Sequence, residues 1–208
     1  MLFRSDIVFL LDTSGFGAQG NFVKEKDFVK SMAKVLNVAP EFSRAAVILF
    51  GTFPDTKVKF VGYRTLSDFN GLVDKAQPSR GSRRIDRSLE EASKVLVDRR
   101  RGVPYIVVLV TSGRQSQSGN SISFEDAVKP LDKIGAHTFV VAIGHDPDTS
   151  KNVLPVPSFN DLHSRVYKMA RQIKTASGNY SYEGGFLRNL SRLLSNDFNK
   201  LTLPNSTF

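Results

Sequence analysis

Cysteine and tryptophan are both absent from this chain of 208 residues, and histidine occurs only three times. Without thiols the chain can form neither a disulfide framework nor a thiolate metal site, and it has no cysteine nucleophile. His137, His145 and His163 are scattered along the sequence, and none has the spacing of a zinc-binding pair. We therefore expect a protein that is not an enzyme.

Long hydrophobic runs are also missing. No apolar segment approaches the roughly 20 residues of a transmembrane helix, so no contact with a membrane is expected. Met1 lies only a few residues before the first apolar segment, so we expect neither a signal peptide nor a transit peptide in this chain. The expectation is then either a cytoplasmic protein or a piece cut from a longer secreted one.

Acidic residues are outnumbered by basic ones, and the net charge at pH 7 is +9. Such a charge attracts polyanions in general. The basic residues gather in two clusters, Arg80–Arg87 and Asp98–Gly102. They are not interleaved with aromatic residues in a stacking platform, so nucleic acid is not an expected partner. Sulfated polysaccharide is one alternative, and a solvated surface without a dedicated partner is another.

The last part of the chain differs from the rest in composition. It is polar and carries three Asn-x-Ser/Thr triplets, which favour a secreted origin, at Asn179, Asn189 and Asn205. We expect one domain over residues 5–175 and a C-terminal extension with a short helix over residues 176–208.

Continuous apolar and β-branched segments predict strands that are buried on both faces of a parallel sheet. These segments cover residues 6–12, 44–51, 104–112 and 137–144. Residues 56–63 alternate between apolar and polar instead, which is typical of an edge strand. Residues 153–156 form a further short edge strand after a loop rich in Asp, Pro and Ser.

Between the strands, apolar residues recur near a period of 3.6 residues, which predicts helices that cover the sheet. The predicted helices are residues 21–38, 66–76, 85–98, 123–135 and 158–176. Ser67 and Ser123 are expected N-caps, and Gly135 is expected to follow a helix end. Pro130 should kink its helix or mark a short first turn. Strands that alternate with helices predict an α/β fold with helices on both faces of the sheet.

Polar residues follow several of the buried strands at the point where each strand ends. Asp12 and Ser14 follow the first strand, and Ser112 and Gly113 follow the strand at 104–112. In sheets of this kind, ligands bind beyond the carboxyl ends of the strands. We therefore expect these residues to meet at one edge of the sheet.

The sequence resembles the von Willebrand factor type A (vWA) domain in six segments that follow one another in the order of that family: DIVFLLDTSG, NFVKEKDFVKSMAKVL, RAAVILFG, RSLEEASKVL, VPYIVVLVTSGRQ and GAHTFVVAIG. The likeness covers roughly residues 5–175. It implies a Rossmann-like fold with a mostly parallel central sheet, one antiparallel edge strand and helices on both faces. It also implies a module of an extracellular matrix or adhesion protein.

Many members of that family bind a divalent cation at a metal-ion-dependent adhesion site (MIDAS). Its first ligands lie in an Asp-x-Ser-x-Ser turn after the first strand. Asp12 and Ser14 match two positions of this turn, but Phe16 occupies the third and has no oxygen to offer.

The remaining family ligands are a Thr in a Gly-Gly-Thr loop and an Asp in a Thr-Asp-Gly turn. The Thr falls on Ser82 or Arg83, depending on how the loop is aligned, and Ser112 stands where the second carboxylate would be. One carboxylate and a few hydroxyls make a poor site for a divalent ion. The candidate ligands Asp12, Ser14, Ser82 and Ser112 are thus a degenerate set, and we expect no metal cofactor, with Mg²⁺ as the alternative.

A carboxylate at a strand end needs a partner if it is to be buried. We hypothesise that the guanidinium of Arg83 or Arg84 occupies the space of the missing cation and pairs with Asp12. The alternative is that Asp12 only accepts hydrogen bonds from Ser14 and from backbone N–H groups of its own turn.

Phe16 and Phe53 fall in loops at the same edge, where exposed aromatic side chains suit a protein interface. The alternative is that they cover the vacated metal cavity. The expected binding surface consists of these two residues with Arg80, Arg83, Arg84 and Arg87.

The combined expectation is a secreted, non-enzymatic module, cut from a longer chain, that acts without a functional MIDAS cation. Its expected partners are extracellular matrix proteins such as collagen, or other copies of the module. Two alternatives stay open. One is a cation-dependent adhesion module of the collagen-binding kind, and the other is a module that binds sulfated polysaccharide through its arginines.

Overall fold

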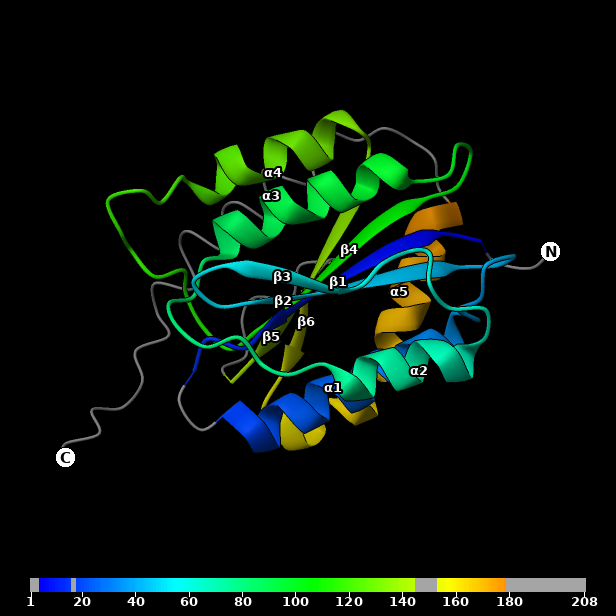
Figure 1. The fold of residues 1–208 in the computed structure, drawn as a ribbon, viewed down its shortest axis with the longest axis horizontal. Helices are drawn as coiled ribbons and strands as arrows, with labels where there is room; N and C mark the ends of the chain where they lie inside the picture. Colours follow the sequence, from blue (N-terminus) through cyan, green and yellow to red (C-terminus); the bar gives the residue numbers. More distant parts are fainter. Residues whose placement is uncertain (1–3, 16–17, 145–152, 179–208) are drawn as a thin grey trace.

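The structure is a computed structural model, and it describes residues 4–15, 18–144 and 153–178. These residues form one six-stranded sheet with helices on both of its faces (Figure 1). The strand order is β3-β2-β1-β4-β5-β6. All neighbouring strands are parallel except β2 and β3, so the expected α/β fold with one antiparallel edge strand is confirmed.

The strands are β1 (Asp6–Asp12), β2 (Arg44–Phe50), β3 (Pro54–Val58), β4 (Tyr105–Thr111), β5 (His137–Ile143) and β6 (Val153–Val156). Strand β3 lies earlier in the chain than its alternating pattern indicated. The pattern extends past the strand because Phe60 and Tyr63 are also buried, although they lie in the turn that follows β3.

The helices are α1 (Ala18–Val35), α2 (Leu66–Lys75), α3 (Ile85–Val95), α4 (Phe124–Lys133) and α5 (Val166–Gly178), with three short 3₁₀ turns, η1 (Leu96–Asp98), η2 (Phe159–Asp161) and η3 (His163–Arg165). The last predicted helix therefore begins as two 3₁₀ turns. None of the helices that the structure describes has the length and apolar character needed to cross a membrane. The predicted C-terminal extension lies outside the described residues from 179 onward.

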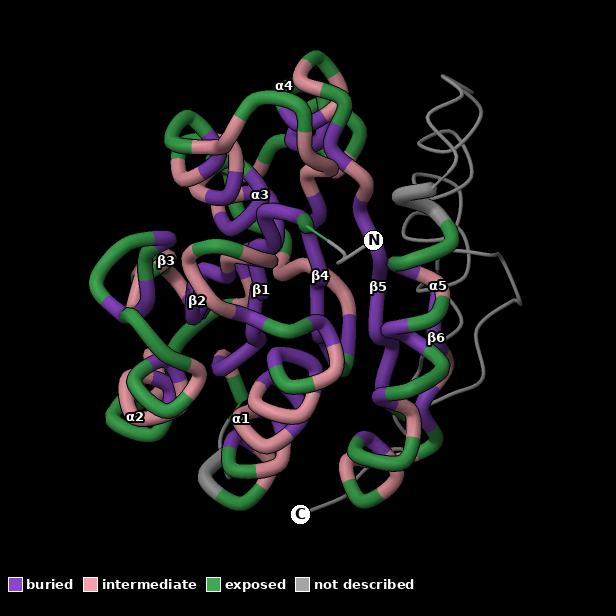
Figure 2. Tube along the Cα trace, turned by 90° about the vertical axis from the view of Figure 1, so that its right-hand side faces the viewer, coloured by how far each residue is buried: buried purple, intermediate pink, exposed green. Residues whose placement is uncertain are grey.

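Strand β1 is at the centre of the sheet and is buried over its whole length. Ile7, Phe9 and Leu11 pack on the side of α1, α2 and α5. Val8 and Leu10 pack on the opposite side, with α3 and α4. Figure 2 shows the strands as a buried layer between the two layers of helices. This alternation follows from the two-residue period of a strand, and it explains why both faces of β1 are apolar.

Several helix ends differ from the predicted ones. Helix α1 begins and ends three residues earlier than predicted, and α3 ends at Val95, where the 3₁₀ turn η1 follows. The N-cap of α2 is Thr65 and not Ser67, because Thr65 Oγ1 accepts from the N–H of Asp68 at 3.1 Å while the Asp68 carboxylate accepts from the N–H of Thr65 at 3.0 Å. Ser123 caps α4 as predicted, and Gly135 follows that helix with φ +71°. Helix α4 continues through Pro130.

At the amino end of β1, the carboxylate of Asp6 is fully buried between two arginines. Arg44 donates from Nε to Oδ1 at 3.0 Å and from Nη2 to Oδ2 at 2.6 Å. Arg100 donates from Nε to Oδ1 at 2.9 Å, and its backbone N–H donates to Oδ2 at 2.6 Å. Burial alone would raise the pKa of Asp6, but the hydrogen bonds and charges of the two arginines outweigh it and lower this pKa.

We expect Asp6→Asn to lower the free energy of unfolding by about 3 kcal/mol, because two partly buried guanidiniums would lose the charge that they share. Unfolding in urea measures the loss. Asp27→Asn is the matched control, since Asp27 is half-exposed and its partner Lys30 also pairs with Asp74, so the loss should be less than about 1 kcal/mol. Equal losses in the two variants would contradict this account.

Candidate functional site

The carboxyl ends of the parallel strands meet at the edge of the sheet on the left of Figure 1. The loop that leads from α2 to α3 crosses this edge, because Thr13 Oγ1 at the end of β1 donates to the carbonyl of Ser79. We call this edge the rim and define it as residues 12–14, 79–84 and 111–116.

Asp12 lies at the centre of the rim with its side chain almost fully buried. Its Oδ1 accepts from Ser14 Oγ at 2.6 Å and from the Ser14 N–H at 3.1 Å. Its Oδ2 accepts from Thr111 Oγ1 at 2.8 Å and from Nε of Arg83. The carboxylate thus has both a charged partner and hydrogen bonds, which its burial requires.

The guanidinium of Arg83 lies between Asp12 and the turn that follows β4. Its Nη2 donates to Ser112 Oγ at 3.4 Å, and its Nη1 donates to the carbonyl of Arg114 at 3.3 Å. Of the two arginines considered from the sequence, Arg83 is the one that pairs with Asp12. The local hydrogen bonds from Ser14, which were the alternative, are present in addition.

Gly113 provides the space for this guanidinium. A Cβ atom at residue 113 would lie 2.5 Å from Nη1 of Arg83 and 3.1 Å from its Cζ. Such an approach is closer than packed side chains tolerate, so a larger residue would have to displace the guanidinium. The position of the Arg83 guanidinium therefore depends on a glycine at residue 113 of the Thr-Ser-Gly turn.

Backbone contacts in the loop before α3 orient Arg83 toward Asp12. The N–H of Arg83 donates to Ser116 Oγ at 3.0 Å, and the N–H of Ser82 donates to Thr52 Oγ1 at 2.9 Å. The side chain of Ser82 is exposed, and among the described residues it has no hydrogen bond to the Asp12 site. Of the four candidate ligands, Ser82 is thus the one whose side chain makes no contact with the Asp12 site among the described residues.

Arg84 forms a separate buried pair. Its Nε and Nη2 donate to Oδ1 and Oδ2 of Asp86 at 2.9 and 2.7 Å. Nη2 also donates to the carbonyl of Asn120 at 2.9 Å, and the N–H of Ile122 donates to Asp86 at 3.2 Å. Burial alone would raise the pKa of Asp86, but the hydrogen bonds from Arg84 and from the backbone lower it. The pair fastens residues 113–122 to the start of α3.

The expected binding surface is only partly described. Phe53 is 68% exposed, and the Arg87 guanidinium lies 4.8 Å from the centroid of its ring. Arg87 Nη1 also donates to the carbonyl of Thr52 at 2.9 Å. Arg80 is exposed, and Phe16 lies outside the described residues. Because Phe53 stays exposed, its ring does not cover a cavity.

A second carboxyl group lies near the rim. Glu25 on α1 is 1% exposed, and its Oε2 has no hydrogen-bond partner among the described residues. Burial and, to a smaller extent, the charge of Asp12 raise the pKa of Glu25 well above its ordinary value. The environment beneath the rim therefore favours the neutral acid more than water does.

Sequence reasoning missed both Glu25 and Thr111. Glu25 is three residues after Phe22 and four before Val29, on the apolar stripe of α1, so the helical period could have found it. Thr111 ends the strand that pairs with β1 on the side opposite β2, and only the strand order reveals that it faces Asp12.

The rim residues do not fit a divalent cation. No cluster of three or more His, Cys, Asp or Glu side chains suited to a metal is found in the part of the chain that the structure describes. Nε of Arg83 donates a hydrogen bond to Oδ2 of Asp12, so this oxygen is not free to bind a cation. The positive charge of the guanidinium also repels an approaching cation. With the guanidinium in place, an ion would meet one carboxylate and a few hydroxyls, which is short of the ligands that Mg²⁺ needs.

The two basic clusters of the sequence lie at opposite ends of the sheet. Arg83 binds Asp12 at the carboxyl end of β1, and Arg100 binds Asp6 at its amino end. A strand of seven residues spans about 20 Å, at roughly 3.3 Å per residue. The clusters therefore do not form one continuous basic surface.

We expect Gly113→Ala to lower the free energy of unfolding by about 1–3 kcal/mol, because the new methyl group displaces the Arg83 guanidinium. Urea unfolding gives the loss, and the NMR signal of the Arg83 Nε–H should move. Gly119→Ala is the control, since a Cβ there would have no atom within 4 Å. An unchanged Nε–H signal in Gly113→Ala would refute the proposed crowding.

We expect Glu25→Gln to gain stability relative to the native chain as the pH rises. A carboxyl group whose pKa is raised by folding stabilises the fold below its unfolded pKa, near 4.5, and loses that contribution as the pH rises through its folded pKa. Between these values the difference should grow by about 1.4 kcal/mol per pH unit. Urea unfolding over a pH series measures it. A difference that stays flat over the pH series would contradict the prediction.

Comparison with known proteins bears on the family of this domain. The family model of the von Willebrand factor type A domain matches residues 6–177. The von Willebrand factor A domain-containing protein 1 of Bos taurus is 28% identical over 145 residues, which are 68% of this chain and 34% of the relative. The collagen alpha-4(VI) chain of Mus musculus is 23% identical over 178 residues, which are 82% of this chain and 7% of the relative.

A solved structure agrees with the fold. Proximal thread matrix protein 1 from the mussel byssus, with a zinc-occupied MIDAS motif, is similar with a TM-score of 0.71 and 23% identity over 83% of this chain and 46% of that one. The chain spans about a third of the length of the first relative and a much smaller part of the second. Because the family model covers most of its residues, the chain belongs to the von Willebrand factor type A family.

Proposed function

We propose that this vWA domain binds other proteins in the extracellular matrix, without catalysis and without a bound divalent cation. The curated relatives come from matrix and adhesion proteins, which supports a protein-binding module in general. Collagen and further copies of the module are the proposed partners. The observation that carries the cation-independent part is the Arg83 guanidinium on the Asp12 carboxylate.

The ion pair at the rim supports binding without a metal, because Arg83 supplies both the positive charge and hydrogen-bond donors that a partner can reach. Arg83 supplies a positive charge at the carboxyl end of β1, and Gly113 accommodates it. The side chain of Arg83 keeps 23% of its surface exposed, so its outer nitrogens remain within reach of a partner. Their present bonds, to Ser112 and Arg114, are long at 3.4 and 3.3 Å and hence weak.

The surface beside the rim, next to Thr52, offers the contacts that protein interfaces favour. Phe53 is exposed, and Arg87 lies over its ring. Aromatic and arginine side chains are enriched among the residues that dominate binding energy. We therefore propose that Phe53, Arg87 and the exposed Arg80 contact the partner.

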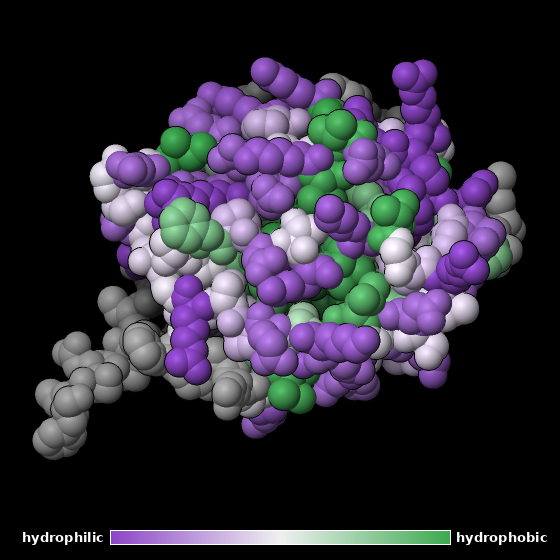
Figure 3. All heavy atoms as spheres, in the orientation of Figure 1, coloured by the Kyte–Doolittle hydropathy of each residue, from purple (hydrophilic) through white to green (hydrophobic). Residues whose placement is uncertain are grey.

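The polysaccharide alternative receives less support from the geometry. The arginines of the two basic clusters lie at opposite ends of the sheet, and the charges of several are neutralised by carboxylates within the domain. Arg83, Arg84 and Arg100 each have a carboxylate partner in the fold. Figure 3 shows hydrophilic side chains around a band of hydrophobic ones on one face of the domain, so this face is not uniformly polar.

We expect Mg²⁺ and Mn²⁺ to leave the thermal unfolding temperature of the native domain unchanged. The double variant Arg83→Thr with Ser112→Asp should instead be stabilised, because it removes the guanidinium and restores a second carboxylate. At an ion concentration of 100 times the Kd, the gain is about 2.7 kcal/mol. Differential scanning calorimetry with and without the ions measures it.

The matched control is Arg87→Thr with Ser112→Asp, which removes an arginine outside the Asp12 site and should gain nothing. If Mg²⁺ stabilised the native domain and Asp12→Ala abolished that effect, cation-independent binding would be refuted. The cation-dependent alternative would then hold.

A further inference from the structure

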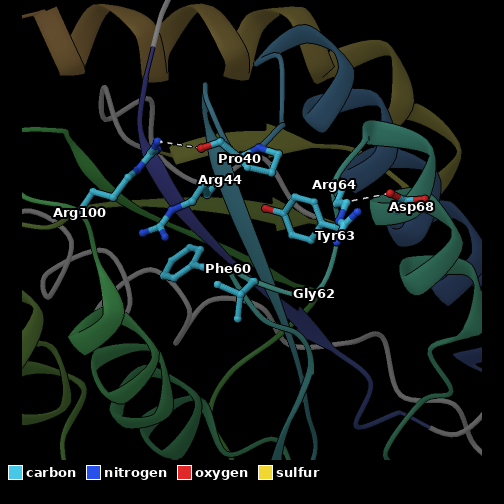
Figure 4. A pocket seen from close by; sticks show the side chains of 9 residues that line it. Pro40, Arg44, Phe60, Gly62, Tyr63, Arg64, Asp68 and Arg100 are labelled. Carbon is cyan, nitrogen blue, oxygen red and sulfur yellow. Dashed lines mark hydrogen bonds between the residues drawn. The ribbon is translucent and has the colours of Figure 1, made fainter.

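A hollow of about 640 Å³ opens at the amino ends of the strands, at the end of the sheet opposite the rim (Figure 4). The start of β2, the turn after β3 and the segment before β4 surround it. Its lining includes Arg44, Phe60, Val61, Tyr63 and Arg64. We call it the amino-end hollow.

The buried network around Asp6 fixes one wall of the hollow. Arg44 and Arg100 both donate to the Asp6 carboxylate, so the Arg44 guanidinium is held in place before any partner arrives. Arg44 also lies over the ring of Phe60, with 5.0 Å between Cζ and the ring centroid. Two arginines share a single carboxylate, which leaves one positive charge in excess at this wall.

Donors without acceptors line the hollow. Arg44 uses Nε and Nη2 within the domain, and its Nη1 has no hydrogen-bond partner among the described residues. The guanidinium of the exposed Arg64 also has none in that part of the chain. The nearby carboxylate of Asp68 accepts through Oδ2 from the N–H groups of Arg64 and Thr65.

The other wall is apolar and equally fixed. Val61 is 70% exposed, whereas Phe60 and Tyr63 are buried behind it. Tyr63 is locked to β2, because its hydroxyl donates to the carbonyl of Ala45 at 3.1 Å and accepts from the Ala45 N–H at 2.7 Å. Figure 4 shows the Phe60 ring beside the Arg44 guanidinium and the Tyr63 ring farther along the hollow, next to Arg64. An exposed apolar residue thus lies close to unpartnered arginine donors.

We propose that the amino-end hollow binds a segment of a partner protein in which an acidic residue is adjacent to an apolar one. The carboxylate would accept from Arg44 Nη1, whose planar fork suits carboxylate geometry, and the positive charge of Arg64 on the other side of the hollow would attract it further. The apolar side chain would cover Val61. Because Arg44 is already ordered, little side-chain entropy is lost on binding.

A sulfated polysaccharide suits the hollow less well. Such a chain is polar throughout, so it would leave Val61 exposed to water. A protein segment with one acidic and one apolar side chain matches both walls.

Selection of random linear peptides displayed on phage against the full chain tests this proposal. The selection is run in EDTA, so that its outcome does not depend on cations at the rim. We expect enrichment of peptides with Asp or Glu next to an aliphatic or aromatic residue. The best peptide is then synthesised, and fluorescence polarisation measures its affinity for the native chain and for the variants.

Arg64→Glu should weaken binding at least about tenfold, which corresponds to about 1.4 kcal/mol. Arg101→Glu is the matched control, because it makes the same change of charge at an exposed residue that does not line the hollow, and it should change the affinity less than about twofold. Val61→Asp should also weaken binding, whereas Val97→Asp, at an exposed valine outside the hollow, should not.

Three outcomes overturn the proposal. The first is a selection without an acidic and apolar motif. The second is equal affinity of Arg64→Glu and Arg101→Glu for the enriched peptide. The third is retention on heparin that falls in Arg64→Glu while no such peptide is enriched, since this would assign the hollow to sulfated polysaccharide. None of these outcomes bears on cation-independent binding at the rim, which has its own test.

Discussion

A buried carboxylate must be neutralised, and the central strand of this domain carries one at each end. Asp6 is held by Arg44 and Arg100, and Asp12 is held by Arg83. Each arginine comes from outside β1, so each ion pair ties another segment to the end of that strand. The rim and the amino-end hollow both result from this constraint, although they lie at opposite ends of the sheet.

The fold could be predicted from the sequence to a large extent, because its signals are local. The continuous apolar run of β1 and the helical period of α1 identify a buried strand and the helix that covers it. Errors occur where residues outside an element share its pattern, as Phe60 does beyond β3. The N-cap at Thr65 was missed because two nearby hydroxyl residues are both good caps, and the reciprocal bonds with Asp68 decide between them.

The site could be predicted only in part, because its contacts join distant positions. Asp12 and its neighbour Ser14 were found from their place after a buried strand. The loop that replaces a family motif limited the partner of Asp12 to Arg83 or Arg84, and the structure decides for Arg83. The space that Gly113 leaves for the guanidinium depends on atomic packing, which no periodicity reveals. The bond between Asp6 and Arg100 spans 94 residues, and the composition of the Asp98–Gly102 cluster indicated only a charged surface.

The guanidinium beside Asp12 differs from a dissolved ion in one respect. It is covalently attached to the chain, so it has no dissociation constant and no chelator can withdraw it. Its abundance at the rim is one per molecule whatever the mineral content of the surroundings. The occupancy of a metal site depends on the ion concentration around the protein. The positive charge of Arg83 beside Asp12 does not, because it is part of the amino-acid sequence. Under the proposed cation-independent function, the supply of divalent cations would therefore not control such a module.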